Sequence, residues 1–379
     1  MNLDPSSSAP RGSVAASGAS GAEQPLLAVR DLCKYFPLKS GLLHKRMSWV
    51  HAVDHVSFSV DAGETLGIVG ESGCGKSTAA RLLMRLLDPD RGEVDFSGRR
   101  VGDAAGISIR ELRRNMQMVF QDSYSSLNPR LPVEDTITFG PIVHGLSRQE
   151  ARTLARELLA QVGLEPNSFV RRYAHELSGG QRQRVNIARA LALHPRLLIL
   201  DEAVSSLDKS IAAQVLNLLM DLKAKLHLTY LFISHDLNVV QYLSDRVMIM
   251  YLGKVMEVGP VEDIYRSALH PYTRALLSAM PSMDPDRRTT EPPLTGDPPN
   301  PIDPPPGCRF RPRCAYAEEV CGTREPELAD GAWGPRHAVA CHMAVPGSGH
   351  SRAGQIPAPP HLARGSNDSD ARGASRRSS

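Results

Sequence analysis

The sequence predicts an α/β fold in which short apolar strands alternate with helices around a phosphate-binding loop. Residues 70–78 fit the pattern GxxxxGK followed by Ser or Thr. An apolar run precedes this loop, and a helix with periodic apolar residues up to Leu87 follows it. Further apolar runs at 116–120, 197–200 and 230–233 are separated by helical patterns, which is typical of a parallel sheet.

The length and composition limit the class of protein. The 379 residues can form one large domain with extensions, or two domains. A net charge of +3 is too balanced to indicate a nucleic-acid surface, so we expect no nucleic-acid partner. No apolar run approaches the roughly 18 to 20 residues that cross a bilayer, and the N-terminus lacks a secretory signal. We therefore expect a soluble, intracellular protein.

Both ends of the chain have the composition of disordered segments. Residues 1–25 are rich in Ser, Ala, Gly and Pro and lack apolar periodicity, and residues 344–379 are rich in Gly, Ser, Pro and Arg. Between them we expect an ordered domain over residues 26–262 and a C-terminal extension over residues 263–343.

The first ordered residues predict an antiparallel edge sheet beside the phosphate loop. Apolar residues recur from Leu26 to Phe36 and alternate from Ala52 to Val60, and a short strand pair is expected near residues 94–96. Tyr35 or Phe36 offers a ring that could stack on an adenine base, although an aromatic residue in an edge strand more often only packs.

The residue types of the phosphate loop indicate a nucleotide triphosphate site. Its glycines let backbone N–H groups close around phosphates, and Lys76 reaches the outer phosphates. The Ser77 hydroxyl is offered to Mg²⁺ at the positive end of the following helix. The predicted nucleotide-binding residues are Gly70, Glu71, Ser72, Gly73, Cys74, Gly75, Lys76, Ser77 and Thr78.

A helical insertion is expected over about residues 123–181. Ser147 and Glu150 have the spacing of a capping box at the start of a helix whose apolar residues share one face. Gln121 lies just before the insertion, where a buried-type strand passes into a flexible segment. Near its end, residues 177–184 place two glycines before a helix, which is typical of an anion-binding N-terminus.

Three polar residues follow the ends of two apolar strands, where parallel sheets bind their ligands. Asp201 and Glu202 follow the run 197–200. The first carboxylate suits Mg²⁺ and the second suits the orientation of an attacking water, although such a pair can also be a helix cap or a solvated turn. His235 follows the run 230–233, where a histidine can be functional, although a lone histidine is more often structural.

Taken together, these motifs resemble the ATP-binding subunit of ABC transporters. The resemblance covers residues from about 26 to 262, and six motifs occur in the family's order. They are the Walker A loop (70–78), the Q-loop (Gln121), the signature LSGGQ (177–181), the Walker B strand (197–202), the D-loop (205–208) and the switch histidine (His235). The position of Phe36 relative to Lys34 matches the residue that stacks on adenine in this family.

The resemblance implies an ATPase that acts as a pair, with each ATP between the phosphate loop of one domain and the signature of a second ABC ATPase subunit, identical or homologous. It implies that Glu202 polarises the attacking water and that His235 contacts the γ-phosphate. Gln121 would join Ser77 around Mg²⁺, with Asp201 holding this metal shell from outside. The signature residues are Ser178, Gly179, Gly180 and Gln181, and Asp208 is the D-loop residue.

The residues after 262 narrow the resemblance to a subfamily. A short helix is expected over residues 270–277, followed by a Pro-rich linker over residues 280–306 that cannot build a core. The helix, the segment 121–129 and the stretches around Cys308, Cys314 and Cys341 resemble the oligopeptide and dipeptide importer ATPases.

This subfamily implies ATP hydrolysis that powers the import of oligopeptides or dipeptides through two separate transmembrane permease subunits. An extracytoplasmic peptide-binding protein would be an indirect partner, and the chain would lie peripherally at the cytoplasmic face of the inner membrane. Close relatives import nickel, so a nickel importer ATPase is an alternative. A soluble ABC protein that acts on ribosomes or DNA is another.

Four cysteines of the extension predict a ligated centre that replaces a hydrophobic core. Their gaps of five, six and nineteen residues differ from the close pairs of structural zinc sites. The importer family carries a four-iron, four-sulfur (4Fe-4S) cluster on matching cysteines, so the resemblance implies this cluster, with Zn²⁺ or reduced thiols as alternatives. The residues are Cys308, Cys314, Cys321 and Cys341. Cys33 is expected in the core and Cys74 is expected to be inert.

Overall fold

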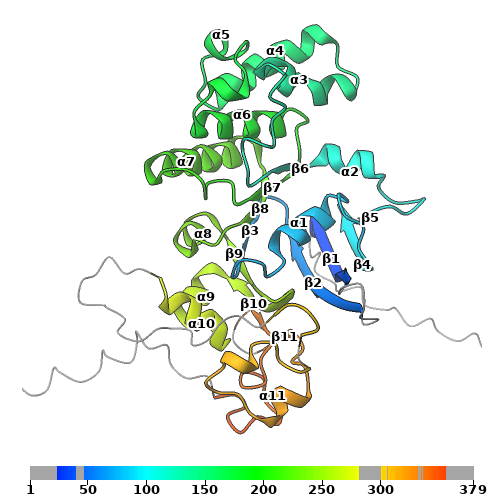
Figure 1. The fold of residues 1–379 in the computed structure, drawn as a ribbon, viewed down its shortest axis with the longest axis vertical. Helices are drawn as coiled ribbons and strands as arrows, with labels where there is room; N and C mark the ends of the chain where they lie inside the picture. The colour runs from blue at the N-terminus through cyan, green and yellow to red at the C-terminus, as the bar shows by residue number, and fades with distance from the viewer. Residues whose placement is uncertain are drawn as a thin grey trace, which may run out of the picture.

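The computed structural model of the protein describes residues 24–39, 47–280, 300–304, 306–331, 334 and 336–355. Most of the N-terminal segment and of the Pro-rich linker therefore lies outside the described residues. The helical insertion lies at one end of the molecule, the sheets lie in the middle, and the C-terminal extension lies at the other end (Figure 1). In the part of the chain that is described, no helix is both long enough and apolar enough to cross a membrane.

The central sheet has eight strands in the order β11-β12-β10-β9-β3-β8-β7-β6. The strands from β9 to β6 are parallel, and β10, β12 and β11 continue the sheet in antiparallel fashion. The bounds are β3 (Thr65–Val69), β6 (Met116–Val119), β7 (Leu197–Asp201), β8 (Thr229–Ile233), β9 (Arg246–Tyr251), β10 (Lys254–Pro260), β11 (Ala329–Asp330) and β12 (Ala338–Val339).

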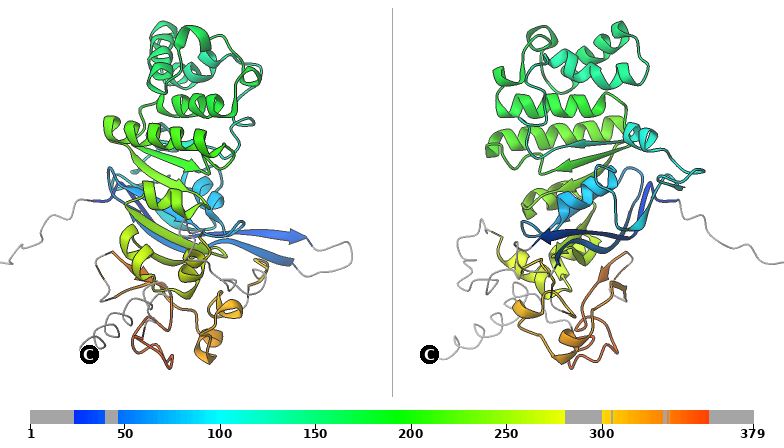
Figure 2. Two further views of the ribbon diagram at one scale, coloured as in Figure 1. Left: turned by 90° about the vertical axis from the view of Figure 1, so that its left-hand side faces the viewer. Right: turned by 45° about the vertical axis from the view of Figure 1, so that its right-hand side comes forward.

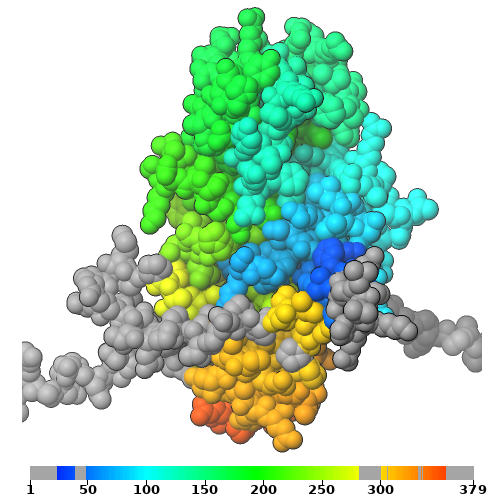
Figure 3. Space-filling model, in the orientation of Figure 1, coloured from blue at the N-terminus to red at the C-terminus, as the bar shows by residue number. Residues whose placement is uncertain are grey.

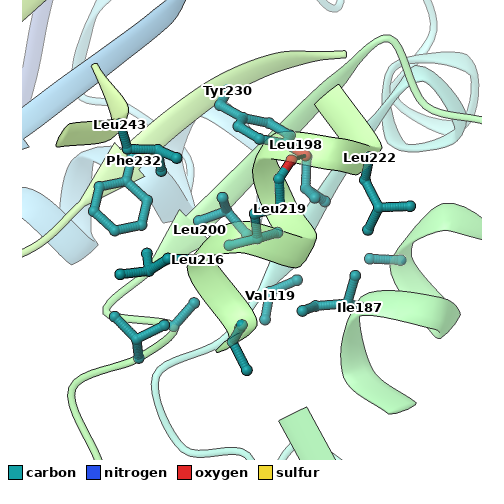
Figure 4. Close-up of a cluster of buried hydrophobic side chains, with 14 of the residues drawn as sticks. Val119, Ile187, Leu198, Leu200, Leu216, Leu219, Leu222, Tyr230, Phe232 and Leu243 are labelled. Atoms are coloured by element: carbon teal, nitrogen blue, oxygen red, sulfur yellow. Dashed lines mark hydrogen bonds between the residues drawn. The ribbon is translucent and has the colours of Figure 1, made fainter. Parts of the chain in front are cut away.

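Both faces of the parallel strands are buried, which explains why they read as continuous apolar runs. On one face, Leu198 and Leu200 of β7 and Phe232 of β8 pack against α7 (Lys209–Leu226), as Figure 4 shows. Tyr230 belongs to the same cluster, and its hydroxyl donates to the Leu219 carbonyl at 2.8 Å. The alternate residues of β7 and β8 face a second core that contains α1 (Lys76–Leu83).

The predicted antiparallel strands are present and form a four-stranded sheet of their own in the order β2-β1-β4-β5. Inside this sheet, β1 has β2 hydrogen-bonded to one side and β4 to the other, both in antiparallel fashion. Figure 2 shows β1 and β2 projecting from the body of the molecule. The bounds are β1 (Leu27–Lys39), β2 (Met47–Val60), β4 (Arg91–Phe96) and β5 (Arg99–Arg100).

The helix after the phosphate loop is shorter than predicted. The sequence predicts apolar periodicity up to Leu87, whereas α1 ends at Leu83. Arg85 has a positive φ of 54°, which breaks the helix, and Arg113 of α2 (Ile109–Asn115) donates to the carbonyl oxygens of Met84 and Arg85 at 3.1 and 2.8 Å. These bonds satisfy carbonyl groups that the end of a helix leaves free.

The expected helical insertion is present and extends from the sheet as a helical layer. The capping box is formed: Glu150 N donates to Ser147 Oγ at 3.2 Å, and Ser147 N donates to the Glu150 carboxylate at 3.0 Å. The helices of this region are α3 (Val133–Val143), α4 (Arg148–Gln161), α5 (Pro166–Phe169), η1 (Ala174–Glu176) and α6 (Gly179–Leu191).

The C-terminal extension is joined to the central sheet. Its strand β12 pairs with β10, with Glu257 opposite Val339 and Val258 opposite Ala338. In Figure 3 the extension forms a continuous lobe against the sheet region. The remaining helices are α8 (Leu237–Leu243), α9 (Val261–Ser267), α10 (Pro271–Ser278), η2 (Arg311–Arg313) and α11 (Glu319–Thr323).

The predicted start of the disordered tail at residue 344 is wrong. Residues 344–355 are described, and Ala344 and His350 are buried. His350 Nε2 lies 2.8 Å from the Tyr316 carbonyl oxygen, so this segment folds back over the cysteine-containing part of the extension. The composition is misleading here because a few side chains, rather than apolar periodicity, hold the segment in place.

Candidate functional site

The phosphate loop connects β3 to α1, as its sequence predicts. Gly70 and Gly75 have φ values of 157° and 106°. A Cβ atom on Gly70 would lie 2.1 Å from the Met250 carbonyl oxygen, and one on Gly75 would lie 2.0 Å from the Ala52 carbonyl oxygen. Only glycine fits at these two positions, because neighbouring backbone packs directly against the loop.

Lys76 is held at the centre of this loop. Its side chain is buried, and Nζ donates to the carbonyl oxygens of Gly70 at 2.8 Å and Glu71 at 3.0 Å. A fixed cation inside a loop of backbone N–H groups is a suitable cradle for phosphate groups. Ser72 and Gly73 are exposed, and Cys74 is buried beneath them, where burial raises the pKa of its thiol. Thr78 lies in the first turn of α1.

Ser77 and Asp201 form the candidate magnesium site. Ser77 Oγ donates to Asp201 Oδ1 at 2.9 Å, which joins the start of α1 to the end of β7. Burial raises the pKa of the Asp201 carboxyl, and the neighbouring charge of Glu202 raises it further. A hydroxyl and a carboxylate are hard oxygen donors, so this pair fits Mg²⁺, whose charge would favour the ionised carboxylate.

The three predicted catalytic side chains lie together at the ends of three neighbouring strands. Gln121 Nε2 donates to Glu202 Oε2 at 2.8 Å, and His235 Nδ1 lies 3.5 Å from the same oxygen. Glu202 has a φ of 48°, and its backbone N–H donates to the Ile233 carbonyl oxygen at 2.9 Å. The carboxylate is therefore flanked by an amide and an imidazole beside the Ser77–Asp201 pair.

Phe36 remains the better candidate for stacking on a base. The Tyr35 hydroxyl donates to Asp54 Oδ1, and the Tyr35 ring lies 4.5 Å from the His51 ring, so Tyr35 is committed to packing. Phe36 is half-buried and pairs with Val50 on β2. Two residues further along β2, the Ala52 carbonyl oxygen packs against Gly75 of the phosphate loop.

The signature residues lie in the helical insertion, apart from the phosphate loop of the same chain (Figure 1). Ser178 and Gln181 form a capping box at the start of α6, with Gln181 N donating to Ser178 Oγ at 3.3 Å. A Cβ on Gly180 would lie 2.5 Å from Ile211, and one on Gly179 would lie 3.5 Å from Leu207 of the D-loop. Asp208 is exposed at the start of α7. Signature and D-loop therefore share one surface.

The extension contacts the phosphate loop directly, which sequence reasoning missed. Arg313 Nη1 donates to both carboxylate oxygens of Glu71, at 2.9 and 3.0 Å, and Glu71 N donates to the Tyr272 hydroxyl at 3.1 Å. More than 200 residues separate Glu71 from these two partners. No local pattern indicates such a contact.

The four cysteines of the extension line one cavity, together with His270, Phe310 and Tyr316. Burial and the charges of the neighbouring cysteines raise the pKa of Cys308 to about 12 and that of Cys341 to about 11. Such thiols stay protonated at neutral pH unless a metal ion displaces the proton.

Among the described residues, three metal-ligand atoms come within 4.8 Å of one another only at Asp31, Cys33 and His55. These three groups bond to one another: His55 Nδ1 pairs with Asp31 Oδ1, and His55 N donates to Cys33 Sγ at 3.2 Å. Cys33 is fully buried, as predicted.

Two family models match the chain. Residues 53–205 match the model described as ABC transporter, and residues 256–321 match the model described as oligopeptide/dipeptide transporter, C-terminal region. The second match begins in β10 and contains three of the four cysteines.

Several curated proteins are similar over most of their length. The oligopeptide transport ATP-binding protein AppF of Bacillus subtilis is 49% identical, with 85% of this chain and 98% of that protein covered. The probable peptide ABC transporter ATP-binding protein y4tS of Sinorhizobium fredii is 50% identical, with 85% and 90% covered. The di/tripeptide transport ATP-binding protein DppF of Pseudomonas aeruginosa is 46% identical, with 84% and 98% covered.

Solved structures share the fold of the core. CbiO1 of Clostridium perfringens, part of the ABC transporter complex cbiONQ, superposes with a TM-score of 0.55 at 28% identity and covers 65% of this chain and 92% of its own. The ATP-binding cassette MJ0796, a dimer bound to ADP and phosphate, gives 0.53 at 28% identity and covers 62% and 98%.

Proposed function

Because the chain belongs to the ABC transporter ATP-binding proteins of the oligopeptide and dipeptide group, we propose that it is the ATP-hydrolysing subunit that powers peptide import. The observation that supports this function most strongly is the 49% sequence identity to AppF, over 98% of that protein. The site agrees with it, since the phosphate loop, the Ser77–Asp201 pair and the carboxylate of Glu202 lie together.

In the proposed mechanism the loop residues bind the phosphates, and Lys76 neutralises their charge. Ser77, Gln121 and Asp201 would hold Mg²⁺, which would supply positive charge that offsets the negative charge of the phosphates. Glu202 accepts a hydrogen bond from the attacking water and orients it, because its carboxylate is fixed between Gln121 and His235. The His235 side chain is more than half exposed, and its imidazole would contact the terminal phosphate.

A complete site would need a second ATPase subunit, identical or homologous. Ser178, Gly179, Gly180, Gln181 and Asp208 lie on a surface apart from the phosphate loop of the same chain, and the start of α6 offers backbone N–H groups to an anion. A head-to-tail pair brings this surface of one subunit onto the phosphate loop of the other. The dimer reported for MJ0796 supports this arrangement.

Two transmembrane permease subunits would dock on the helical insertion, with an extracytoplasmic peptide-binding protein as an indirect partner. Phe139 and Val143 of α3 and Tyr124 near the Q-loop are all more than half exposed. Large exposed apolar side chains close together in sequence are typical of protein interfaces. This docking would keep the chain at the cytoplasmic face of the inner membrane as a peripheral subunit.

The transport function is tested by uptake in cells that carry Lys76→Ala. Without this cation ATP binding fails, so uptake of labelled di- and oligopeptides should fall to background while nickel uptake is unchanged. Lys225→Ala, an exposed lysine near the end of α7, is the matched control and should transport normally. Loss of nickel uptake alone would contradict peptide import, and loss of neither would contradict a transport role.

We also propose that Cys308, Cys314, Cys321 and Cys341 hold a metal centre. The four cysteines line one cavity, and thiolates are the ligands of a 4Fe-4S cluster, which we propose as the centre, with Zn²⁺ as the alternative.

The centre is tested by the metal content of protein purified without oxygen. Iron, acid-labile sulfide and visible absorbance are expected in the wild type, and all three should be lost in Cys314→Ser but kept in Cys33→Ala. Bound zinc without visible absorbance would contradict the 4Fe-4S cluster and support a zinc site instead. Protein that is folded and free of metal would contradict both.

A further inference from the structure

We propose that Arg313 of the C-terminal extension is a positioning residue for ATP binding, and that it acts by holding Glu71 of the phosphate loop. The proposal rests on the function proposed above, because it concerns the same nucleotide site. It assigns a role to the loop between Cys308 and Cys314, which lies outside the ATP-binding motifs.

All polar groups of Glu71 have partners. Its carboxylate accepts from Arg313 Nη1, its backbone N–H donates to the Tyr272 hydroxyl, and its carbonyl oxygen accepts from Lys76 Nζ at 3.0 Å. Two of these three partners belong to the C-terminal part of the chain. The conformation of the loop's second residue is thus set from outside the motif.

Arg313 is itself held rigidly. Its side chain is only 6% exposed, and its guanidinium carbon lies 6.0 Å from the centre of the Tyr251 ring. Tyr251, Tyr272 and Phe310 form a cluster of rings with centres 4.6 to 5.5 Å apart, which supports the turn that carries Arg313. Cys308 N also donates to the Cys321 carbonyl oxygen at 2.8 Å, so this turn is tied to α11.

The charge of Arg313 has a specific consequence for nucleotide binding. Without it, the Glu71 carboxylate would be an unpaired anion within the loop that must accept the phosphates, and its repulsion would oppose binding. With it, Glu71 and Arg313 together add no net charge. A variant that lacks both charges should therefore lose much less ATP affinity than a variant that lacks only the Arg313 charge. General destabilisation of the protein would not produce this pattern.

If the extension affects ATP binding through Arg313, bound ATP must also affect the extension, because linkage between two sites is reciprocal. If Arg313 transmits the conformation of the extension to the loop, bound nucleotide must stabilise the extension. Backbone amides of residues 308–323 should then exchange more slowly with solvent when ATP is bound, and this effect should vanish without Arg313.

The experiment measures the Kd of the full chain for ATP and Mg²⁺ in four proteins: wild type, Arg313→Met, Glu71→Gln/Arg313→Met and Arg311→Met. The Arg311 variant loses the same charge from the same turn, but Arg311 Nη1 donates to the Pro306 carbonyl oxygen at 3.3 Å rather than to the phosphate loop. We expect Arg313→Met to weaken binding about tenfold. The double variant should recover most of this loss, and Arg311→Met should bind like the wild type.

Three results would overturn the proposal: wild-type affinity in Arg313→Met, equal weakening in Arg311→Met, or a double variant as weak as Arg313→Met. Hydrogen exchange of residues 308–323 with and without ATP gives the second readout, and unchanged exchange in the wild type would also contradict the proposal. A wild-type chain that binds ATP no better than Lys76→Ala would instead overturn the proposed function itself, so the two failures are distinguishable.

Discussion

Replacing Glu202 by Gln is expected to lower the rate of phosphate release about 100- to 1,000-fold while ATP binding is retained. The carboxylate lies between Gln121 and His235, 2.8 and 3.5 Å from their nitrogen atoms. There it can accept a hydrogen bond from the attacking water. An amide of the same shape keeps the contacts but loses the charge that polarises the water. Loss of one such preorganised group typically costs about 3 to 4 kcal/mol in the transition state.

The measurement is steady-state phosphate release at saturating ATP, with ATP affinity determined in parallel. Glu157→Gln, on the exposed side of α4, is the matched control and should hydrolyse ATP at the wild-type rate. A Glu202→Gln protein with an unchanged rate would exclude Glu202 as the residue that orients the water. Loss of ATP binding would instead indicate a role in holding the nucleotide.

Replacing Glu257 by Gln is expected to destabilise the docked extension by about 3 kcal/mol, roughly a 150-fold change in the unfolding equilibrium. Glu257 is fully buried in β10. Its Oε1 accepts from Leu269 N at 2.8 Å and lies 2.9 Å from His337 Nε2, and its Oε2 accepts from His270 N at 3.0 Å. Whichever oxygen becomes the NH₂ group, a donor then faces a buried backbone donor.

Chemical denaturation measures the loss in the free energy of unfolding, and limited proteolysis shows whether residues 261–355 are released first. Glu262→Gln, a few residues away on α9 and exposed, should have no measurable effect. A Glu257→Gln protein as stable as the wild type would mean that Glu257 is not what secures α10 and β12 to the central sheet.

Much of the ATP site can be read from the sequence because each motif is local. The glycines and Lys76 of the loop at residues 70–78 identify it by their spacing alone, and Asp201, Glu202 and His235 lie at or just after the ends of apolar runs. The carboxyl ends of parallel strands lie at one edge of a sheet, so the strand pattern alone predicts that the residues following these strands lie close together. The capping box of Ser147 and Glu150 is predictable for the same reason, because both partners lie within one turn.

Features that depend on distant partners could not be predicted in this way. The end of α1 depends on Arg113, nearly 30 residues away, and the four-stranded sheet depends on the pairing of β1 with β4, which lies beyond the phosphate loop in the sequence. Residues 344–355 have the composition of a tail, yet a contact between His350 and Tyr316 orders them.

The sequence alone therefore determined the ATPase motifs, the order of the main elements and the cysteine-containing extension, since these depend on residue type and spacing. Only the tertiary structure decided how the extension is attached: β12 adds to the central sheet, Glu257 holds α10, and Arg313 reaches Glu71. The physical reason is that these contacts join residues 13 to 242 positions apart, so they depend on how the whole chain packs, which no local pattern records.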